Sequence, residues 1–562
     1  MRKRRRGAIV PKVLYTGDCN QFFYFAGLYD RRGLPTSIHA FMRLAARSGV
    51  DAYLCNPNAG LAFYPSRVVV TAFDGYRRGD REFFRAHVEA ENATAAQREA
   101  TYRFLTGIWD RYLDLLEQGV DWVQEVARAC RRTGVAPWLS IRMNDMHGWP
   151  DLQRSHMNSP LLKNPRMRLP GRAYYPGKRF LPDWAKALNY ALPEVRNTMF
   201  AMIRELVCDY DYEGIELDFL RNTALIEPVA SETDISMVCD WIASIRELTL
   251  RQARKNGRPY PLGLRIPSHL VLLRERGLDV VRLARERLID FVGVANWLQA
   301  SWDIPYDQLR EELGDILIYG GIDCTPNDLG VFNPRARLVQ RRCLSTSAPS
   351  LYGNAATKWA LGVDGVELFN FFGGDGPGTL ARYSALRHLA SPDDLRGRPK
   401  HYAFSSNLNL GSIEDAIENF PCAIRRGTRH AFRLPMLAEP AGRELRVQVI
   451  FERKPWHEFI GIAFNGGHPR YASVAANRFL FAGDNWSHIV TQPRGLGLSQ
   501  LPPAYTSRVF RFNAEVIREG WNTVVLYYGD YGDHSAPDDY LTVVGLELAV
   551  VPMFAFLIIK AY

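Results

Sequence analysis

Two acidic residues lie close together inside an apolar run, in the stretch "YEGIELDFLRN" from Tyr212 to Asn222. Residues i and i+2 of a β-strand point to the same face, so a strand here would direct Glu216 and Asp218 the same way. A buried carboxylate is costly unless it is paired or hydrogen-bonded. The spacing therefore indicates a polar site on this strand rather than simple packing.

Polar residues also follow most of the other apolar runs that are typical of strands. The run over 136–145 and the residues after it supply Arg142, Asn144, Asp145 and His147, and the stretch quoted above adds Arg221. The remaining runs end in Asp18, Arg265, Asn296, Trp297, Asp323, Glu367 and Asn370. In barrel enzymes the active site lies at the carboxyl ends of the strands, so we expect these side chains to converge there.

The elements that would position them alternate regularly, with about eight strand–helix units between residues 12 and 390. One helical stretch runs from Arg111 to Gly134, where the glycine suits a helix end. Parallel strands buried on both sides fit a closed barrel. We therefore predict an α/β protein with a (β/α)8 TIM barrel over 12–395, after a basic N-terminal tail over 1–11. A doubly wound open sheet is the alternative, but no glycine-rich phosphate loop follows the first strand.

After about residue 400 the pattern changes to strands separated by turn residues, as in "RELRVQVIFERK" and "FIGIAFNGG". This pattern predicts an all-β sandwich domain over 400–562. The stretch "REGWNTVVL", followed by "TVVGLELAV", resembles the closing strands of galactose-binding-like jelly rolls. The resemblance implies a jelly-roll-like sandwich of that kind.

The composition is that of a globular protein, with 47% hydrophobic and 23% charged residues in a chain of 562. The net charge is +10, but five basic residues are gathered in the "RKRRR" of Arg2 to Arg6. No recognition helix, zinc finger or aromatic RNA-binding signature accompanies them. We therefore predict no nucleic-acid partner.

The eight cysteines form no CxxC pair, and several lie in apolar patterns, as buried thiols of a reducing compartment do. No apolar signal-peptide core follows the basic start, and no run reaches the ~18 apolar residues of a membrane span. The interpretation is a cytoplasmic protein with no membrane partner. If the true start of the protein lies upstream of Met1, the argument against export does not hold.

Carboxylates, arginines and aromatic side chains in one barrel mouth suit the cleavage of a glycosidic bond. One carboxylic acid protonates the leaving oxygen, and one carboxylate attacks the sugar or activates water. Neighbouring groups push the pKa values of the two acids apart, so that one of them stays protonated. Asn, Asp, Arg and His side chains, all present at the predicted strand ends, can bind sugar hydroxyls.

The motif "YEGIELDFLR" resembles the fourth-strand motif of glycoside-hydrolase-type barrels. In family 18 chitinases this run reads DG and then D-x-D-x-E, and its catalytic glutamate would fall on Leu220, so chitinase chemistry is not supported. In the α-galactosidase-like clan an aspartate nucleophile ends the fourth strand, and Asp218 matches it. That clan's sixth-strand acid has no clear counterpart unless Asp303 serves. The motif is most similar to the DGI-x-LD of bacterial glycosyl-hydrolase-like barrels related to family 10-like hypothetical glycosidases.

The resemblance and the strand-end positions together suggest roles. Asp218 is the first choice for nucleophile or base, the acid is Glu367 or Asp145, and Glu216 tunes the pair from a deeper layer. The predicted substrate-binding residues are Arg142, Asn144, His147, Arg221, Arg265, Asn296, Trp297 and Asp323, among which Arg142 and Arg265 would hold hydroxyls or a carboxylate. The prediction is a glycoside hydrolase of oligo- or polysaccharides that needs no cofactor and no metal. An acid–nucleophile separation of ~5 Å would give retention, and one of ~6.5–9.5 Å inversion.

Three other interpretations stay open. A non-catalytic carbohydrate-binding protein with an inactive glycosidase-like barrel is the main alternative. A hard cation could bind Asp18, Asp145, His147 and Asp218, although the chain has no HxH or HExxH pattern. A nucleic-acid binder driven by charge would lose its binding when the basic tail is deleted. The sugar, the linkage and the oligomeric state are not set by these patterns.

Overall fold

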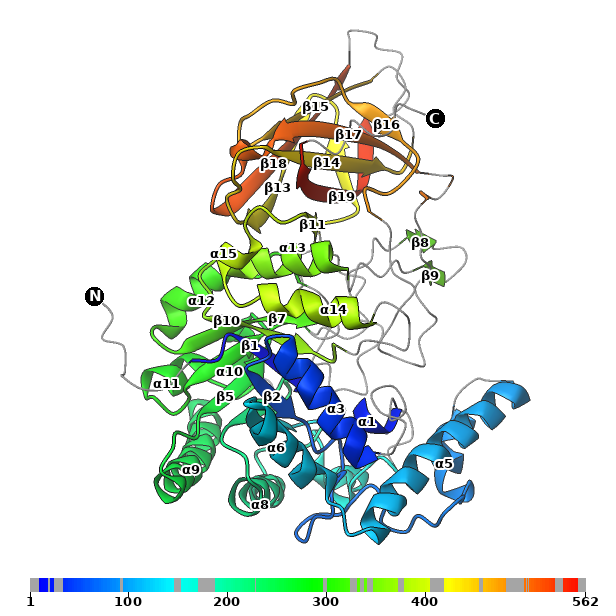
Figure 1. Ribbon diagram of the computed structural model, residues 1–562, viewed down its shortest axis with the longest axis vertical. Helices are drawn as coiled ribbons and strands as arrows, with labels where there is room; N and C mark the ends of the chain where they lie inside the picture. The colour runs from blue at the N-terminus through cyan, green and yellow to red at the C-terminus, as the bar shows by residue number, and fades with distance from the viewer. Residues whose placement is uncertain are drawn as a thin grey trace. The chain divides into compact units, whose positions relative to one another are not determined.

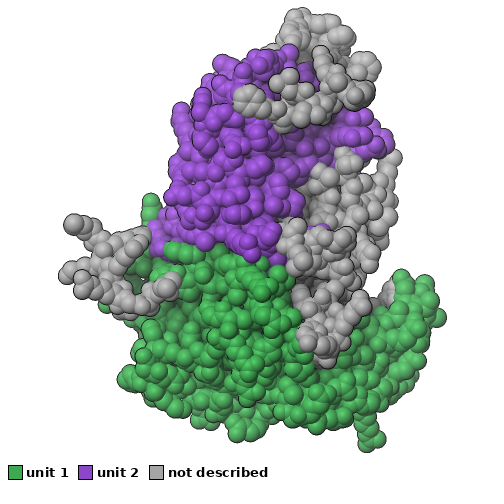
Figure 2. Space-filling view, in the orientation of Figure 1, with its two compact units in different colours: residues 1–297, 311–318 green, residues 298–310, 319–562 purple. Residues whose placement is uncertain are grey.

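The computed structural model describes residues 10–18, 21–24, 34–90, 94–145, 153–169, 187–227, 229–296, 301–323, 331–333, 338–340, 347–371, 379–404, 419–453, 458–481, 500–501, 503, 505–530 and 539–553. The chain forms two compact units (Figure 2). Unit 1 comprises Met1–Trp297 and Glu311–Ile318, and unit 2 comprises Leu298–Arg310 and Tyr319–Tyr562. This division falls inside the seventh barrel strand (Leu317–Asp323) and places the eighth with the sandwich. The domain boundaries predicted from the sequence stay a prediction.

Eight strands close into a barrel in the order β1-β10-β7-β6-β5-β4-β3-β2 (Figure 1). They are β1 (Val13–Gly17), β2 (Ala52–Cys55), β3 (Ala136–Arg142), β4 (Ile215–Asp218), β5 (Leu262–Ile266), β6 (Phe291–Val294), β7 (Leu317–Asp323) and β10 (Gly365–Phe369). The neighbouring pairs from β1 to β6, and the pair of β7 with β10, are parallel. The predicted (β/α)8 barrel is confirmed, and the buried strands show why their sequences are so apolar.

The helices of unit 1 begin and end at local signals. They are α1 (Gln21–Tyr24), α3 (Leu34–Arg47), α4 (Arg85–Ala90), α5 (Ala95–Glu117), α6 (Trp122–Thr133), α7 (Pro160–Lys163), α8 (Pro193–Asp209), α9 (Glu232–Asn256), α10 (Leu270–Glu275) and α11 (Val280–Arg285). The single helical stretch predicted to run up to Gly134 is wrong, because the chain breaks between α5 and α6. Gly119 has φ +66° there, and the side chain of Asp121 caps α6 by accepting from the N–H groups of Val123 and Gln124.

The remaining helices are α12 (Tyr306–Leu313), α13 (Ala348–Trp359), α14 (Thr379–Ala385) and α15 (Pro392–Leu395), and β8 (Val331–Asn333) pairs with β9 (Leu338–Gln340). No helix in the described ranges is long and apolar enough to cross a membrane.

The sandwich of unit 2 has two antiparallel sheets. Its strands are β11 (Lys400–Ala403), β12 (Cys422–Arg425), β13 (Thr428–Met436), β14 (Arg443–Phe451), β15 (Glu458–Phe464), β16 (Val474–Ala476), β17 (Thr506–Asn513), β18 (Gly520–Asp530) and β19 (Tyr540–Pro552). One sheet has the order β11-β19-β14-β17-β16, with β12 also on β19, and the other has the order β13-β18-β15. The rings of Phe464 and Phe512, one from each sheet, lie 6.0 Å apart, so the sheets share an apolar core. The predicted sandwich is confirmed.

Within unit 2, α13 packs closely on the first sandwich strand. A Cβ atom at Gly353 would lie 1.9 Å from the main-chain oxygen of His401, so only glycine allows this approach. The indole of Trp521 also donates to Asp307 of α12 over 2.9 Å. The sandwich is therefore built directly onto helical elements of the same unit.

Candidate active site

The register of β3, β4 and β5 sorts their polar residues into two layers. Arg142 and Arg265 pair with Asp218 on either side, at the carboxyl end of the strands. One layer deeper, Ser140 pairs with Glu216. Residues two apart on a strand share a face, so the arginine–aspartate layer lies directly above the Ser140–Glu216 layer. The expectation that Glu216 lies one layer below Asp218 is confirmed by this register.

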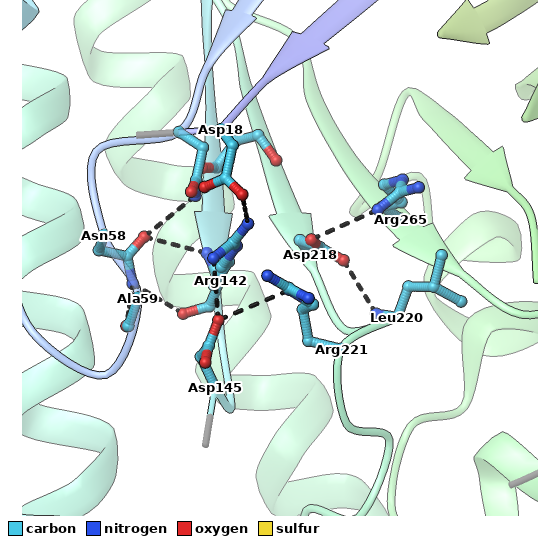
Figure 3. A network of polar contacts seen from close by, with 11 residues as sticks. Asp18, Asn58, Ala59, Arg142, Asp145, Asp218, Leu220, Arg221 and Arg265 are labelled. Carbon is cyan, nitrogen blue, oxygen red and sulfur yellow. Dashed lines mark hydrogen bonds and ion pairs between the residues drawn. The ribbon is translucent and has the colours of Figure 1, made fainter. Parts of the chain in front are cut away.

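Asp218 is almost fully enclosed, with 1% of its surface exposed. Its Oδ1 atom accepts from the main-chain N–H of Leu220 at 3.0 Å, and its Oδ2 atom lies 3.5 Å from Nη1 of Arg265 (Figure 3). A buried carboxylate with a main-chain donor and a nearby guanidinium is held in one orientation. Its position at the last residue of β4 is where barrel enzymes place reacting groups.

Arg142 joins two further aspartates to this layer. Its Nη2 atom lies 2.8 Å from Oδ2 of Asp18, and its Nη1 atom donates to Oδ2 of Asp145 at 3.1 Å. The same oxygen of Asp145 lies 3.5 Å from Nε of Arg221, so two guanidinium groups share it (Figure 3). Asp145 therefore accepts from or lies beside two guanidinium groups, which are good partners for a carboxylate.

Arg221 follows β4 and is buried with the cluster. Burial and the neighbouring Arg142 guanidinium lower the pKa of Arg221, and the carboxylates of Asp145, Asp18 and Asp218 act against that change. Arg221 therefore lies close enough to these four charged residues to interact with them electrostatically.

Glu216 lies inside the barrel below this cluster. Its Oε1 atom accepts from the hydroxyl of Ser140 at 2.8 Å, and the residue is fully buried. The hydroxyl of Ser140 gives Glu216 a hydrogen-bond donor within its own layer. The arginines Arg142 and Arg265 lie one layer above, as the strand register shows.

Two asparagines after β2 fix β3, and sequence reasoning missed both. Asn58 donates to the main-chain oxygen of Arg142 at 2.9 Å and accepts from its N–H at 3.1 Å (Figure 3). Asn56 donates to the main-chain oxygen of Ser140 at 2.8 Å. The side chains thus continue the hydrogen bonding of β2 beyond its end and hold Arg142 in place. The only local signal was a polar residue directly after an apolar strand.

Asn144 also makes main-chain contacts. Its Oδ1 atom accepts from the N–H of Leu188 at 3.1 Å, and its Nδ2 atom donates to the oxygen of Ala224 at 2.9 Å. These bonds tie the segment before α8 to the turn after β4. The predicted role of Asn144 in substrate binding stays a prediction beside this structural one.

Glu367 lies on β10 in unit 2 and is buried. A Cβ atom at Gly320 of β7 would lie 2.4 Å from the side chain of Lys358 in α13, so that face of β7 points towards the helix. Glu367 pairs with the next residue, Gly321, and both therefore lie on the opposite, inner face. Asn370, just after β10, has φ +50°, a conformation that asparagine tolerates better than most residues.

The other predicted residues are not joined to this cluster by described contacts. Asn296 is buried just after β6, and no hydrogen bond within the described ranges links it to the cluster. His147 and Trp297 lie outside the described residues, as does the side chain of Asp323. Among the side chains that are described, no group of three or more His, Cys, Asp or Glu residues is arranged to hold a metal ion.

Comparisons with known proteins give fold likenesses only. No family model matches the chain, and no curated protein does. Among solved structures, it is similar to alpha-L-fucosidase isoenzyme 2 from Paenibacillus thiaminolyticus, with 11% identity, a TM-score of 0.38 and coverage of 70% of this chain and 51% of that one. It is also similar to the alpha-amylase from Geobacillus thermoleovorans, with 9% identity, a TM-score of 0.36 and coverage of 92% and 98%. A family GH18 chitinase from Chromobacterium violaceum shows 12% identity, a TM-score of 0.30 and coverage of 75% and 79%.

The chain thus spans about half the length of that fucosidase. With all three TM-scores below 0.5, these likenesses carry no argument about activity. The structure itself shows the architecture, which is a closed (β/α)8 barrel, with a polar cluster at the carboxyl ends of β3, β4 and β5, and a β-sandwich.

Proposed function

We propose that this chain is a glycoside hydrolase that acts on an oligo- or polysaccharide. The observation that carries the proposal is Asp218, a buried carboxylate at the last residue of β4, paired in register with an arginine on each side. Glycosidic cleavage needs one ionised carboxylate in a fixed orientation beside the anomeric carbon. Asp218 meets the requirement of orientation through its contacts with Leu220 and Arg265.

In this proposal Asp218 is the nucleophile or the base that activates water. The second carboxylate must carry a proton that it delivers to the leaving oxygen. Asp145 is poorly placed for that task, because its Oδ2 atom is already engaged by two guanidinium groups. We therefore favour Glu367 as the acid, with Glu216 as a deeper charge that influences Asp218.

A non-catalytic carbohydrate-binding protein is the second candidate. One observation favours it: in unit 1 both Asp218 and Asp145 are already engaged by guanidinium groups, as carboxylates with a structural or ligand-binding role are. The two candidates differ in whether Glu367 delivers a proton.

The test is hydrolysis of a panel of aryl glycosides and oligosaccharides by the wild type and by Asp218→Asn. The matched control is Asp290→Asn, which removes another aspartate bound by an arginine, here Arg246 at 2.6 Å, from the start of β6 at the opposite end of the barrel. A loss of ~10³-fold or more in kcat in folded Asp218→Asn, with Asp290→Asn active, supports a glycosidase.

Three other outcomes discriminate further. Equal loss in both aspartate variants would indicate damage to the fold, and full activity of Asp218→Asn would refute its role in the chemistry. Glycan binding without cleavage by the wild type would favour the second candidate. Glu367→Gln tests the acid: aryl glycosides with good leaving groups should be cleaved far better by this variant than those with poor ones, because they need no proton.

A further inference from the structure

The smaller sheet of the sandwich, β13-β18-β15, has one face in the core and one face open to solvent. Along β13, Phe432 and Leu434 are buried, whereas Arg429, Ala431 and Arg433 are exposed. Side chains alternate between the two faces of a strand, so the three exposed residues share one face. We call it the outer face of β13-β18-β15.

The larger sheet differs, because its outer face is covered. Its outward residues Gln448 and Glu547, which pair in register on β14 and β19, are fully buried. Gln448 donates to the main-chain oxygen of Arg478 at 2.6 Å, and Glu547 accepts from the N–H of Leu480 at 3.0 Å. The segment 478–480 therefore lies over the larger sheet, whereas the outer face of β13-β18-β15 keeps its exposed side chains.

The outer face of β13-β18-β15 carries positive charge that no acid on it balances. Arg429 and Arg433 are four residues apart on β13, which places them ~14 Å apart along the strand. Neither guanidinium forms an ion pair within the described ranges. The register also puts no Asp or Glu at the outward positions of the three strands as the structure describes them. Such a face attracts an anionic partner.

Arg433 is held in a definite orientation. Its guanidinium carbon lies 4.8 Å from the ring centre of Trp521 on β18, and the indole donates to Oδ2 of Asp307 at 2.9 Å. No ion pair in the described part of the chain joins Asp307 to Arg433. A guanidinium stacked on a ring keeps its in-plane N–H groups for hydrogen bonds, and these match the two oxygens of a carboxylate.

The surface between the two arginines is low and has no aromatic ring. Ala431 pairs with Val525, which pairs with Ala463, so small side chains form the row that crosses the sheet there. Proteins that bind single-stranded nucleic acid stack successive bases on aromatic side chains, and this row offers none. A chain of sugars that carry carboxylates fits the face better, because it needs only the guanidinium contacts and a flat surface.

We propose that the outer face of β13-β18-β15 binds a polysaccharide of uronic acids, with carboxylates on Arg429 and Arg433. The choice of a polysaccharide rests on the proposed function, and the choice of carboxylates rests on the two arginines. Because the sandwich and the barrel belong to one chain, polymer held on this face would raise the concentration of substrate around the barrel.

The experiment is fluorescence anisotropy of a labelled oligogalacturonide with the full chain. Arg429→Gln and Arg433→Gln should each weaken binding by ~3-fold and together by ~10-fold, because each removes one charge-assisted contact at an exposed site. The double replacement by lysine should bind with intermediate affinity, because an ammonium group keeps the charge but lacks the fork. The methyl ester of the oligogalacturonide, which is neutral, should bind the wild type ~10-fold more weakly than the acid.

The matched control is Arg470→Gln. Arg470 is also exposed and stacks on an aromatic ring, that of Tyr471 at 5.3 Å, but its N–H donates to the main-chain oxygen of Arg511 in the larger sheet. Its affinity should equal that of the wild type, and thermal unfolding shows whether each variant is folded. Unchanged affinity in the folded double glutamine variant would overturn the inference, as would equal binding of the acid and its methyl ester.

Two other polyanions test the class of partner. Poly(dT) or polyglutamate that binds the wild type as tightly as the oligogalacturonide, with the same dependence on the two arginines, would overturn the assignment to a polysaccharide. Release of reducing sugar is measured separately. Arginine-dependent binding without any cleavage would support this inference although the proposed hydrolysis fails. Cleavage of glycosides together with arginine-independent binding would overturn the inference and leave the proposed function standing.

Discussion

Replacement of a buried lysine by methionine should stabilise this protein at neutral pH. Lys358 of α13 has no exposed surface, and its Nζ atom donates to the main-chain oxygen of Ser301 at 2.5 Å and to the hydroxyl of Thr357 at 3.4 Å. Burial lowers the pKa of Lys358 from 10.5 to about 7, although nearby Asp303 acts in the opposite direction. The charged form of this amine is therefore less stable in the folded protein than in the unfolded chain.

The magnitude follows from proton linkage. Between pH 7 and pH 10.5 the unfolded chain binds a proton that the folded chain has lost, so stability rises with pH over this window. A pKa lowered from 10.5 to about 7 corresponds to ~5 kcal/mol, of which ~4 kcal/mol is felt at pH 7 and ~1 kcal/mol at pH 10. Lys358→Met removes this cost and loses a hydrogen bond worth ~1 kcal/mol. The oxygen of Ser301 keeps a second donor, Nδ2 of Asn354 at 3.2 Å.

We therefore expect Lys358→Met to be ~3 kcal/mol more stable than the wild type at pH 7, with the difference nearly gone at pH 10. The measurement is urea unfolding followed by tryptophan fluorescence at pH 7, 8.5 and 10, on both proteins in parallel. The difference between them cancels the titration of every group that they share.

Lys400→Met is the matched control, because Lys400 is also fully buried but lies 2.7 Å from the buried Glu439. Removing one partner of such a pair leaves an uncompensated carboxylate, so this variant should be less stable by ~3–5 kcal/mol. The two substitutions have opposite expected signs in the same unit. The reasoning would be refuted if Lys358→Met were less stable than the wild type at pH 7. It would also be refuted if the difference in unfolding free energy between the two proteins stayed constant from pH 7 to 10.

Three further changes test other parts of the fold. Gly353→Ala places a Cβ atom 1.9 Å from a main-chain oxygen of β11 and should cost ~3 kcal/mol or more, whereas Gly107→Ala in α5 meets nothing within 4 Å and should gain ~0.5–1 kcal/mol; thermal unfolding measures both. Burial lowers the pKa of His156 from 6.5 to about 3, so below pH 6.5 the unfolded chain binds a proton that the folded chain does not. Stability therefore decreases as the pH is lowered, by ~2 kcal/mol at pH 5. His156→Phe should remove that part of the acid sensitivity, as measured by unfolding curves at pH 7.5 and 5. Asn58→Ala leaves the main-chain N–H and oxygen of Arg142 without this partner and should cost ~2–4 kcal/mol in urea unfolding; a cost below 0.5 kcal/mol would contradict the clamp.

The sequence by itself determined the architecture. The signals for it are local: the alternation of strands and helices, caps such as Asp121 before α6, and the change of pattern near residue 400. Each of them can be recognised within one segment, without knowledge of the segments that it packs against. The two-residue spacing of Glu216 and Asp218 also determined that they share a face, because the strand has a period of two.

Only the tertiary structure decided which charges meet. The register between β3, β4 and β5 sets Asp218 between Arg142 and Arg265, and no pattern within one strand encodes its offset from the next. The contacts of Asp145 with Arg142 and Arg221, which lie on different elements, are another result of the fold. The short break at Gly119 was hidden for a related reason. Its flanking helices each satisfy the helical period, so no change of period marks the break between them. Energies that depend on distances between segments far apart in the chain appear only when the chain is folded.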